Sequence, residues 1–470
     1  MEFEHFSPHI IVVGLGYVGL PLALELAKYF PVLGFDINET RIKELKKNND
    51  WTREVTEEQL AHSPLRISDQ LVDLRIFLDE FTQKVAKAND YSKTNQHSKV
   101  SHSPKALEPQ LQNNQTIYIV TVPTPVTTDH LPDTSLLKKA SETIAKVLQK
   151  NSIVVYESTV YPGVTEEFCG PILEKISGLK SGQDFYLGYA PERINPGDKK
   201  HTLKHITKVV SGQTDAVTKQ LTFIYGKINN NNIFIAKNIK TAEAAKVIEN
   251  AQRDINIAFI NEIAIIVGEL GLSVYDVLEA AETKWNFSRF IPGLVGGHCI
   301  SVDPYYLADC ARALGFQPEV ILSGRHTNEN MSLFLANALH QQLKKQNLGP
   351  THKTRILLLG LTFKENIPDL RNTKVIDLLH TLQNFGYEVE VHDPMADPAT
   401  ALAHLKVSLL SSLQGLKPYD CVFGAVSHQQ YLEFSSTMFQ RLLKPNGLLA
   451  DFKNMWKGKE LPPGIRYWTL

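Results

Sequence analysis

A single cysteine in a glycine-rich stretch suggests the first chemistry in this sequence. Residues 290–307 read FIPGLVGGHCISVDPYYL, where Cys299 follows Gly296 and Gly297 and precedes Asp303 by four residues. The glycines have no β-carbon, so backbone or a ligand can approach the sulfur closely. A thiolate there would be a nucleophile, and the nearby carboxylate could order a water for a later hydrolysis. A buried structural cysteine in a turn explains the stretch equally well.

A second candidate group lies on the longest helical pattern, which runs from Thr241 to Leu270. Lys246 and Asn250 are four residues apart and share one face of this predicted helix. A partly buried lysine beside an amide can stabilise an oxyanion or transfer a proton, although such residues are more often solvated. We expect Thr241 to cap the helix and Gly271 to end it.

The N-terminal segment has the context of a dinucleotide-binding fingerprint. The apolar run HIIVV is followed by GLGYVG, with Gly14, Gly16 and Gly19, then by a helical pattern and a second apolar run ending at Asp36. The glycines allow a turn that brings a pyrophosphate to the helix N-terminus. Asp36 would accept hydrogen bonds from the adenosine ribose and repel a 2′-phosphate. The pattern therefore predicts NAD as the cofactor rather than NADP.

Polar side chains also follow several other predicted strands. Thr121 and Thr159 end two of them, and Glu192 with Arg193 follows a third. Ligands in open α/β sheets bind beyond the carboxyl ends of strands, although turn chemistry also places Ser and Thr there. Lys364 and Arg371 follow a further strand at residues 356–359, a good position to meet phosphates. Arg41, which lies at the start of the next predicted helix, is equally consistent with a solvated charge on the surface.

These patterns predict an α/β protein with two Rossmann-like, doubly wound parallel-sheet domains joined by a long central helix. We expect a nucleotide-binding domain at 1–238, a helical domain with the cysteine stretch at 239–349, and a second Rossmann-like domain at 350–470. Residues 89–115 are polar and carry no motif, so they predict a flexible or disordered surface insertion.

Composition excludes several classes of protein. The chain has 470 residues, 43% of them hydrophobic, and its 49 basic residues nearly balance its 50 acidic ones. We therefore expect no nucleic-acid or membrane partner. The four cysteines show no CxxC spacing, which fits a reducing compartment and predicts no metal site. No signal peptide or long apolar run is evident, so a soluble cytoplasmic protein is expected.

Taken together, the motifs resemble the UDP-glucose/GDP-mannose dehydrogenase family over essentially the whole chain. The matching segments are GLGYVGLPLA with Asp36, TVPTP, ESTVYPG, APERINPGD, the Lys246–Asn250 pair, GGHCISVDP and FKENIPDLRN. The resemblance implies oxidation of a UDP-sugar alcohol at C6 to a carboxylate with NAD, through an aldehyde and a thioester on Cys299. PERINPGD and LVGGHCISVDPYYL resemble the branch that oxidises UDP-N-acetylglucosamine or UDP-N-acetylgalactosamine for bacterial surface polysaccharides.

The resemblance also implies a role for each matching residue. Catalytic roles fall to Cys299, Lys246, Asn250, Asp303, Thr159 and Glu192. Cofactor contacts fall to Gly14, Gly16, Tyr17, Val18, Gly19, Asp36, Arg41, Thr121, Pro123, Thr124, Thr159 and Arg371. Substrate contacts fall to Glu192, Arg193, Lys246, Asn250, Phe290, Gly293, Gly296 and Lys364, and we assign His298 a structural role. The C-terminal domain would bind the UDP-sugar, and the apolar residues around the 241–270 helix predict a homodimer or higher oligomer.

The sequence also departs from the family. Pro196 occupies the position of a second glutamate found in glucose-oxidising relatives, Arg289 does not align with their intersubunit arginine, and the 89–115 insertion has no counterpart. UDP-glucose and UDP-N-acetylmannosamine remain alternative substrates. A non-catalytic nucleotide-sugar-binding regulator would be expected to lack the nucleophile or the Lys246–Asn250 pair. A Cys/His acyltransferase or hydrolase would leave the glycine fingerprint unexplained.

Overall fold

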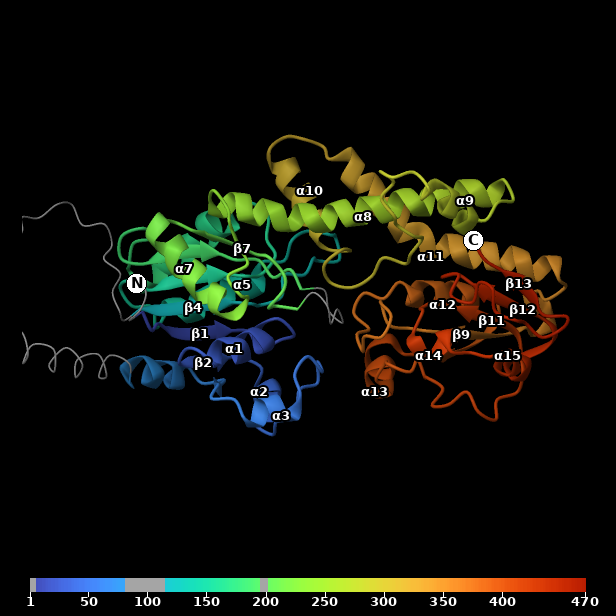
Figure 1. Ribbon diagram of the computed structural model, residues 1–470, viewed down its shortest axis with the longest axis horizontal. Coiled ribbons are helices and arrows are strands. Elements are labelled where there is room, and N and C mark those ends of the chain that lie inside the picture. Colours follow the sequence, from blue (N-terminus) through green and yellow to red (C-terminus); the bar gives the residue numbers. More distant parts are fainter. Residues whose placement is uncertain (1–5, 81–114, 195–201) are drawn as a thin grey trace, which may run out of the picture. The chain divides into compact units, whose positions relative to one another are not determined.

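The computed structural model describes residues 6–80, 115–194 and 202–470 (Figure 1). The chain divides into two compact units, Met1–Val247 and Ile248–Leu470. Each unit contains one sheet flanked by helices, which confirms the predicted α/β class. Except for Gln115, the predicted insertion lies outside the described residues, as does Pro196. The division into three domains stays a prediction.

Unit 1 is built on an eight-stranded sheet with the order β3-β2-β1-β4-β5-β6-β7-β8. Neighbouring strands are parallel except for β6 and β7, so β7 and β8 run against the others. The order reverses between β1 and β4, which is where a doubly wound sheet binds its ligand. The strands are β1 (His9–Val13), β2 (Val32–Phe35), β3 (Arg66–Ser68), β4 (Thr116–Val120), β5 (Ile153–Tyr156), β6 (Tyr186–Tyr189), β7 (Lys208–Gly212) and β8 (Ile233–Ile235).

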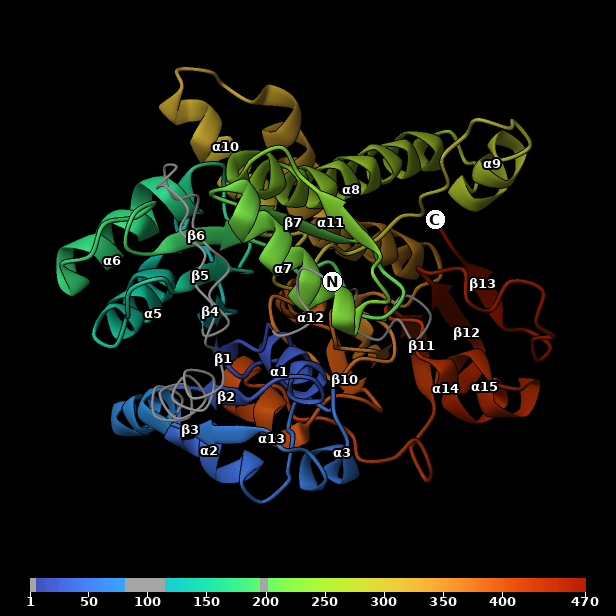
Figure 2. The same ribbon diagram turned by 60° about the vertical axis from the view of Figure 1, so that its left-hand side comes forward.

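Strand β1 shows why this sheet carries helices on both faces. All five of its residues are buried, and successive side chains point to opposite faces. Ile10 and Val12 join a core with α1 and α7, whereas Ile11 and Val13 join a core with α5 and α6. Figure 2 shows the two helix pairs on either side of the strands. The helices are α1 (Gly19–Ala27), α2 (Glu39–Leu45), α3 (Glu57–Ala61), α5 (Ser135–Ala145), α6 (Gly170–Ser177) and α7 (Asp215–Ile228), with a π-helix η1 (Val164–Cys169) and a helical stretch at 71–80.

The long helix predicted from the sequence is α8 (Ile239–Glu269), which spans 31 residues. Its cap differs from the prediction: the Asn238 side chain accepts hydrogen bonds from the Thr241 backbone N–H and hydroxyl, each at 2.8 Å, so Asn238 rather than Thr241 caps the helix. Asparagine is at least as good a cap as threonine, and the helix begins two residues before Thr241, at Ile239. Gly271, with φ of +74°, follows the last turn as predicted.

Unit 2 contains a five-stranded, all-parallel sheet with the order β10-β9-β11-β12-β13. The strand order reverses between β9 and β11, so a ligand site is expected beyond the carboxyl ends of these strands. The strands are β9 (Arg355–Leu359), β10 (Glu388–His392), β11 (Tyr419–Gly424), β12 (Leu443–Asp451) and β13 (Arg466–Trp468).

The two faces of this sheet have separate cores. Ile356 and Leu358 of β9 pack with α11 and α12, whereas Leu357 and Leu359 pack with α14, α15 and Trp456. The unit's helices are α9 (Val274–Ala281), α10 (Asp303–Ala313), α11 (Glu319–Lys345), α12 (Val375–Asn384), α13 (Pro398–Thr400), α14 (Gln429–Leu432) and α15 (Ser436–Leu442), with a 3₁₀-helix η2 (Pro350–His352) and a π-helix η3 (Ala401–Leu405).

Among the described residues, no single helix is long and apolar enough to span a membrane, although α8 and α9 together, bent by 119°, have the length and composition.

Candidate active site

The glycine turn after β1 has the geometry that a dinucleotide fingerprint requires. Gly14 has φ of +98°, which favours glycine. A β-carbon on Gly19 would lie 1.9 Å from the Gly14 carbonyl oxygen and 2.3 Å from Thr121 Oγ1, whereas one on Gly16 would meet no atom within 4 Å. Gly14 and Gly19 are therefore required by the turn itself, and Gly16 faces open space. Tyr17 and Val18 lie between them and lead into α1.

Asp36 and Arg41 both hold the backbone of this turn. Asp36 Oδ2 accepts a hydrogen bond from the Leu15 N–H at 2.7 Å, and Arg41 Nε donates to the Leu15 carbonyl at 2.8 Å. Arg41 is only 2% exposed and forms an ion pair with Asp50 at 2.8 Å, so it is not a solvated charge. Burial alone would raise the pKa of Asp50, but hydrogen bonds from Thr52 and Arg41 bring it below its ordinary value.

Residues after β4 and β5 line the same carboxyl edge of the unit 1 sheet. The Thr121 hydroxyl donates to the Gly14 carbonyl at 2.7 Å, which ties the end of β4 to the glycine turn. Pro123 and Thr124 follow in the same loop. The hydroxyl of Ser158, which precedes Thr159, donates to the Val122 carbonyl at 2.6 Å and joins the loops after β4 and β5.

These residues fit NAD. The glycine turn leaves room at Gly16, and Asp36 follows β2 where the ribose hydroxyls of a dinucleotide are expected. Arg41 lies on α2 and contacts the turn through Leu15, and its buried Nη1 has no hydrogen-bond partner among the residues described, so an unused donor lies next to the turn. Within the described ranges, no group of three or more His, Cys, Asp or Glu residues is arranged to hold a metal ion.

A buried charge cluster surrounds the predicted residue Glu192. Lys208 Nζ lies 2.7 Å from Glu157 Oε2 and 3.7 Å from Glu192 Oε2, and Tyr225 donates to Glu157 Oε1 at 2.6 Å. Burial raises the pKa of Glu157, and the Lys208 ammonium opposes that rise. Glu192 Oε1 also accepts hydrogen bonds from the Arg193 and Ile194 N–H groups, at 2.6 and 2.5 Å, so its carboxylate is held in place. The Arg193 side chain donates to the Thr207 carbonyl at 2.8 Å and so holds the chain that enters β7.

The predicted pair on α8 occupies consecutive turns of one helix. Lys246 is 9% exposed. One turn earlier, the buried Glu243 accepts hydrogen bonds from the Gly163 and Thr165 N–H groups at 2.6 and 2.9 Å. Burial raises the pKa of Glu243 to about 7 despite these bonds. Glu243, which the sequence reasoning did not select, holds the loop that follows Thr159.

Asn250, Asp303 and Cys299 lie together in unit 2. Asn250 Nδ2 donates to Asp303 Oδ2 at 2.5 Å, and the Asp303 N–H donates to the Cys299 carbonyl at 2.8 Å. Asp303 is 2% exposed and begins α10. Cys299 is half-buried. The carboxylate predicted to order a water is therefore fixed both by the α8 amide and by the turn that carries the cysteine.

Close packing explains the two glycines before the cysteine. A β-carbon on Gly296 would lie 2.5 Å from the Asn372 carbonyl oxygen, and one on Gly297 would lie 2.9 Å from the Phe363 ring. Gly297 also has φ of +82°. In addition, Asn372 Nδ2 donates to the Gly297 carbonyl at 3.0 Å. The single loop that connects β9 to α12 thus fixes the backbone next to Cys299.

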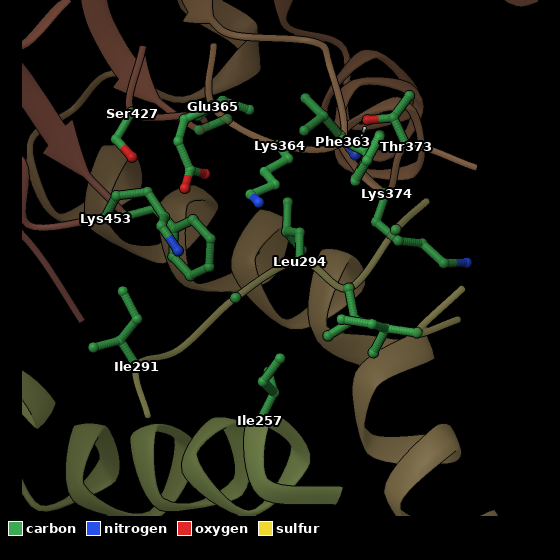
Figure 3. Close-up of a pocket in the computed structure, with 18 of the residues that line it drawn as sticks. Ile257, Ile291, Leu294, Phe363, Lys364, Glu365, Thr373, Lys374, Ser427 and Lys453 are labelled. Carbon is green, nitrogen blue, oxygen red and sulfur yellow. Dashed lines mark hydrogen bonds between the residues drawn. The ribbon is translucent and has the colours of Figure 1, made fainter. Parts of the chain in front are cut away.

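A cavity of about 540 Å³ in unit 2 lies beyond the carboxyl ends of β9, β11 and β12, as the strand order predicts. Its lining includes Phe290, Gly293, Gly296 and Lys364, all selected from the sequence. Figure 3 shows Lys364, Glu365 and Lys453 pointing into the cavity, whereas Lys374 points away. Apolar side chains from α8 and from the 290–296 segment form the opposite wall, among them Ile257, Ile291 and Leu294.

The cavity has a net positive lining. Arg253, Lys364 and Lys453 line it together with the carboxylate Glu365. Two further lining cations are neutralised by carboxylates: Arg289 pairs with Glu282, and Lys374 pairs with Glu329 and Asp377. Such a lining suits a polyanion, for which diphosphate is the expected chemistry. Desolvation lowers the pKa of Lys453, and the carboxylates of Glu365 and Asp451 oppose that shift. The sequence reasoning missed Lys453, although it follows the apolar strand LLAD as Lys364 follows LLLG.

Arg371 lies outside this lining. It is half exposed and pairs with Asp369, with an Nη2–Oδ2 distance of 2.5 Å. Burial alone would raise the pKa of Asp369, but hydrogen bonds from Arg371 bring it below its ordinary value. The predicted cofactor contact of Arg371 therefore stays a prediction.

The loop that carries Lys364 is held by a buried histidine. The Asn366 N–H donates to His428 Nδ1 at 2.9 Å, so Nε2 carries the proton in the neutral ring and can donate to Asp393 Oδ2 at 3.1 Å. Asp393 Oδ2 also accepts from the Leu361 and Thr362 N–H groups, at 2.6 and 2.9 Å. His428 and Asp393 thus hold the backbone on both sides of Lys364, and the sequence reasoning selected neither.

Comparison with known proteins agrees with this geometry. Three domain models of the UDP-glucose/GDP-mannose dehydrogenase family match the chain: the NAD binding domain at residues 8–71 and 79–229, the central domain at 240–330, and the UDP binding domain at 357–458. Protein CapL of Staphylococcus aureus is 46% identical over 98% of this chain and 99% of its own length.

Two further relatives carry a more specific name. The UDP-N-acetyl-D-glucosamine 6-dehydrogenase of Pseudomonas aeruginosa is 44% identical over 94% of this chain and 96% of its own. Among solved structures, the UDP-D-ManNAc dehydrogenase of Pyrococcus horikoshii matches with a TM-score of 0.80 and 28% identity, covering 98% of both chains. The chain therefore belongs to the UDP-glucose/GDP-mannose dehydrogenase family and is an NAD-dependent nucleotide-sugar 6-dehydrogenase.

Proposed function

We propose that this enzyme oxidises the C6 hydroxyl of a UDP-N-acetylhexosamine to the carboxylate, with UDP-N-acetylglucosamine as the first candidate substrate and UDP-N-acetylgalactosamine as the second. The observation that carries this proposal is the identity of 44% and 42% to two enzymes named UDP-N-acetyl-D-glucosamine 6-dehydrogenase. A relative named UDP-N-acetyl-D-mannosamine dehydrogenase is 31% identical over 82% of this chain. The uronic acid product would serve a surface polysaccharide of the capsule or O-antigen type.

The cavity in unit 2 supports a UDP-sugar as the substrate. A diphosphate carries charge that Lys364 and Lys453 can neutralise, and the apolar wall with Ile257 and Leu294 suits the flat faces of a nucleoside. The match of the UDP binding domain at residues 357–458 covers both lysines.

The chemistry requires two oxidations, and bound NAD⁺ supplies the hydride acceptor for each. The Cys299 thiolate adds to the aldehyde carbon to give a thiohemiacetal, whose oxidation leaves a thioester. A water that Asp303 orients then attacks the thioester, and the thiol leaves as the carboxylate forms. The hydrogen bond from Asn250 at 2.5 Å supports this role, because it holds the Asp303 carboxylate in one orientation.

The remaining catalytic assignments follow from the family resemblance. Lys246 and Asn250 would stabilise the oxyanion that develops at C6. Thr159 would hold the hydrolytic water with Asp303, and Glu192 would act as an acid or base near the sugar. For Glu192, the hydrogen bonds from two backbone N–H groups, at 2.6 and 2.5 Å, hold the carboxylate in one position, as this role requires.

A substrate panel tests the proposal. Purified enzyme would be incubated with NAD⁺ and the UDP derivatives of N-acetylglucosamine, N-acetylgalactosamine, N-acetylmannosamine and glucose, and NADH absorbance followed to completion. We expect two NADH per sugar and the highest kcat/KM for an N-acetylhexosamine with the gluco or galacto configuration. A higher value for UDP-glucose or UDP-N-acetylmannosamine would refute the substrate assignment.

Two variants separate the covalent step from charge stabilisation. Cys299→Ser should bind both ligands but lose uronate formation by orders of magnitude, because serine adds poorly to an aldehyde at neutral pH. Lys246→Ala should slow both oxidations, at a cost of about 3 kcal/mol. Mass spectrometry after a single turnover should detect a sugar adduct on Cys299 in the wild type. Wild-type turnover by Cys299→Ser would show that the covalent mechanism is wrong.

A further inference from the structure

The buried side chain of Asn261 on α8 pairs with the backbone of one residue in the cavity wall. Asn261 is 0% exposed. Its Nδ2 donates to the Gly293 carbonyl at 3.0 Å, and its Oδ1 accepts from the Gly293 N–H at 2.9 Å. The carboxamide thus satisfies both polar groups of Gly293, as a neighbouring β-strand would. The reversed amide would set donor against donor and acceptor against acceptor, so its orientation is fixed.

A chain of buried polar groups supports that orientation. Asn261 Nδ2 also donates to Asn328 Oδ1 at 2.8 Å, and Asn328 Nδ2 donates to Asp254 Oδ1 at 2.7 Å. Arg325 Nη1 donates to the same carboxylate oxygen at 2.6 Å. All three of these partners are at most 1% exposed. Such a network is rigid because each bond that breaks leaves a buried polar group unsatisfied.

The segment that Asn261 holds runs between α8 and Lys453. Lys453 Nζ donates to the Pro292 carbonyl at 3.0 Å, one residue before Gly293. A β-carbon on Gly293 would lie 3.8 Å from Ile257 and 3.9 Å from Lys453 Nζ. The two flanking residues of the segment, Ile291 and Leu294, line the cavity (Figure 3). The Asn261 carboxamide therefore sets the distance between the apolar wall and the lysine on the opposite side.

We propose that Asn261 is a positioning residue for the nucleotide-sugar site. By holding the Gly293 backbone against α8, it fixes both the apolar wall and the carbonyl that orients Lys453 toward a diphosphate. This inference rests on the proposed function in one respect, namely that UDP occupies this cavity. Asn261 itself does not line the cavity, so its effect on the ligand is exerted through Gly293 and Pro292.

The test measures UDP affinity by calorimetry in Asn261→Ala, with NAD⁺ affinity as the readout of an intact unit 1. We expect the UDP Kd to rise about tenfold or more, because losing both hydrogen bonds to Gly293 lets the cavity wall move. The NAD⁺ affinity should not change. Asn337→Ala is the matched control: Asn337 is an exposed helical asparagine whose side chain donates to the Leu333 carbonyl of its own helix at 2.9 Å. Its UDP Kd should equal that of the wild type.

Two further variants make the outcome decisive. Asn328→Ala removes one support of the Asn261 carboxamide but keeps its pair with Gly293, so it should lower the melting temperature and raise the UDP Kd less than Asn261→Ala does; an equal or larger rise would show that the Asn261–Gly293 pair is not the decisive contact. If Asn261→Ala does not fold, Asn261→Asp replaces it: this variant keeps the acceptor for the Gly293 N–H but loses the donor for the carbonyl, so UDP should again bind more weakly. A wild-type UDP Kd in the folded Asn261 variant overturns the inference.

Lys364→Ala distinguishes failure of this inference from failure of the proposed function. If Lys364→Ala weakens UDP binding and the Asn261 variants do not, the cavity holds UDP and only the role of Asn261 is wrong. If Lys364→Ala binds UDP as tightly as the wild type, UDP does not occupy the cavity, and both the assigned site and the role of Asn261 are overturned.

Discussion

Alanine substitutions at Gly19 and Gly16 should fail in opposite ways, although both glycines belong to one turn. A β-carbon at Gly19 would lie 1.9 Å from the Gly14 carbonyl oxygen and 2.3 Å from Thr121 Oγ1. A β-carbon at Gly16 would meet no atom within 4 Å. Gly19→Ala is therefore incompatible with the turn as it stands. Gly16→Ala leaves the folded chain undisturbed and extends only into the space where a pyrophosphate is expected.

The structure gives a magnitude for each variant. In Gly19→Ala the obstructing atom is backbone, so α1 must move by more than about 1 Å, an overpacking that costs about 3 kcal/mol. The shift would also break the 2.7 Å hydrogen bond from Thr121 to the Gly14 carbonyl, for about 1 kcal/mol more. A loss of about 4 kcal/mol lowers the melting temperature of a unit of this size by roughly 8 to 16 °C. Gly16 has no positive φ, so Gly16→Ala should change stability by less than about 1 kcal/mol.

Thermal unfolding with and without NAD⁺ distinguishes the two outcomes. At 100 times its Kd, NAD⁺ should stabilise the wild type by about 2.7 kcal/mol. Gly16→Ala should unfold at the wild-type temperature without NAD⁺ and gain little from it, because the methyl group occupies the pyrophosphate position. Gly19→Ala should already unfold early without NAD⁺. The reasoning is refuted if Gly19→Ala unfolds within about 2 °C of the wild type, or if Gly16→Ala binds NAD⁺ as tightly as the wild type does.

Four further predictions follow from groups described above. Asp36 should make kcat/KM much higher for NAD⁺ than for NADP⁺, and equal values in the unmodified enzyme would contradict its role. The folded-state pKa of Glu243, about 7, exceeds its ordinary value of 4.5, so the protonated form favours the fold. The stabilisation that protonated Glu243 contributes below pH 4.5 should be lost as the pH rises through 7, which lowers the free energy of unfolding by about 3 kcal/mol. Denaturant titrations at pH 5 and pH 8 should show this loss in the wild type and not in Glu243→Gln. His428→Gln, which loses the acceptor for the Asn366 N–H, should raise the KM for the UDP-sugar more than His428→Asn, which keeps it; equal KM values would show that this bond does not hold the Lys364 loop. Light scattering at micromolar concentration should give the mass of a dimer or larger assembly, and the mass of a single chain would refute the predicted oligomer.

The fold was predictable where apolar runs and glycine turns repeat in a fixed order. The runs HIIVV, TIYIV and ILLL became β1, β4 and the body of β9 because fully buried parallel strands read as continuous apolar segments. The reversal of β7 and β8 was not predictable, because a strand has the same pattern in either direction. The cap of α8 was misassigned because Asn238 and Thr241 are both good caps, and only geometry separates them.

The sequence predicts the site residues that belong to motifs, but not the buried residues that hold them in position. The role of Arg41 as a buried partner of Asp50 was hidden because Asp50 lies in a polar stretch with no pattern of its own. Asn261 sits among apolar residues of a helix and belongs to no motif. One signal was available: Asp254 and Asn261 are seven residues apart and therefore share the buried face of α8. Polar groups repeated on an apolar face indicate a buried network.

The reversal of β7 affects how freely the connection between β6 and β7 can vary in length and composition. A parallel crossover must return to the opposite edge before the next strand begins, whereas the chain from β6 to β7 leaves and re-enters at the same edge. Continuing the pairing of Tyr189 with Ser211 outward places Glu192 opposite Lys208, which explains their ion contact at 3.7 Å. The connection between the two strands can therefore lengthen, shorten or change composition without displacing any core strand.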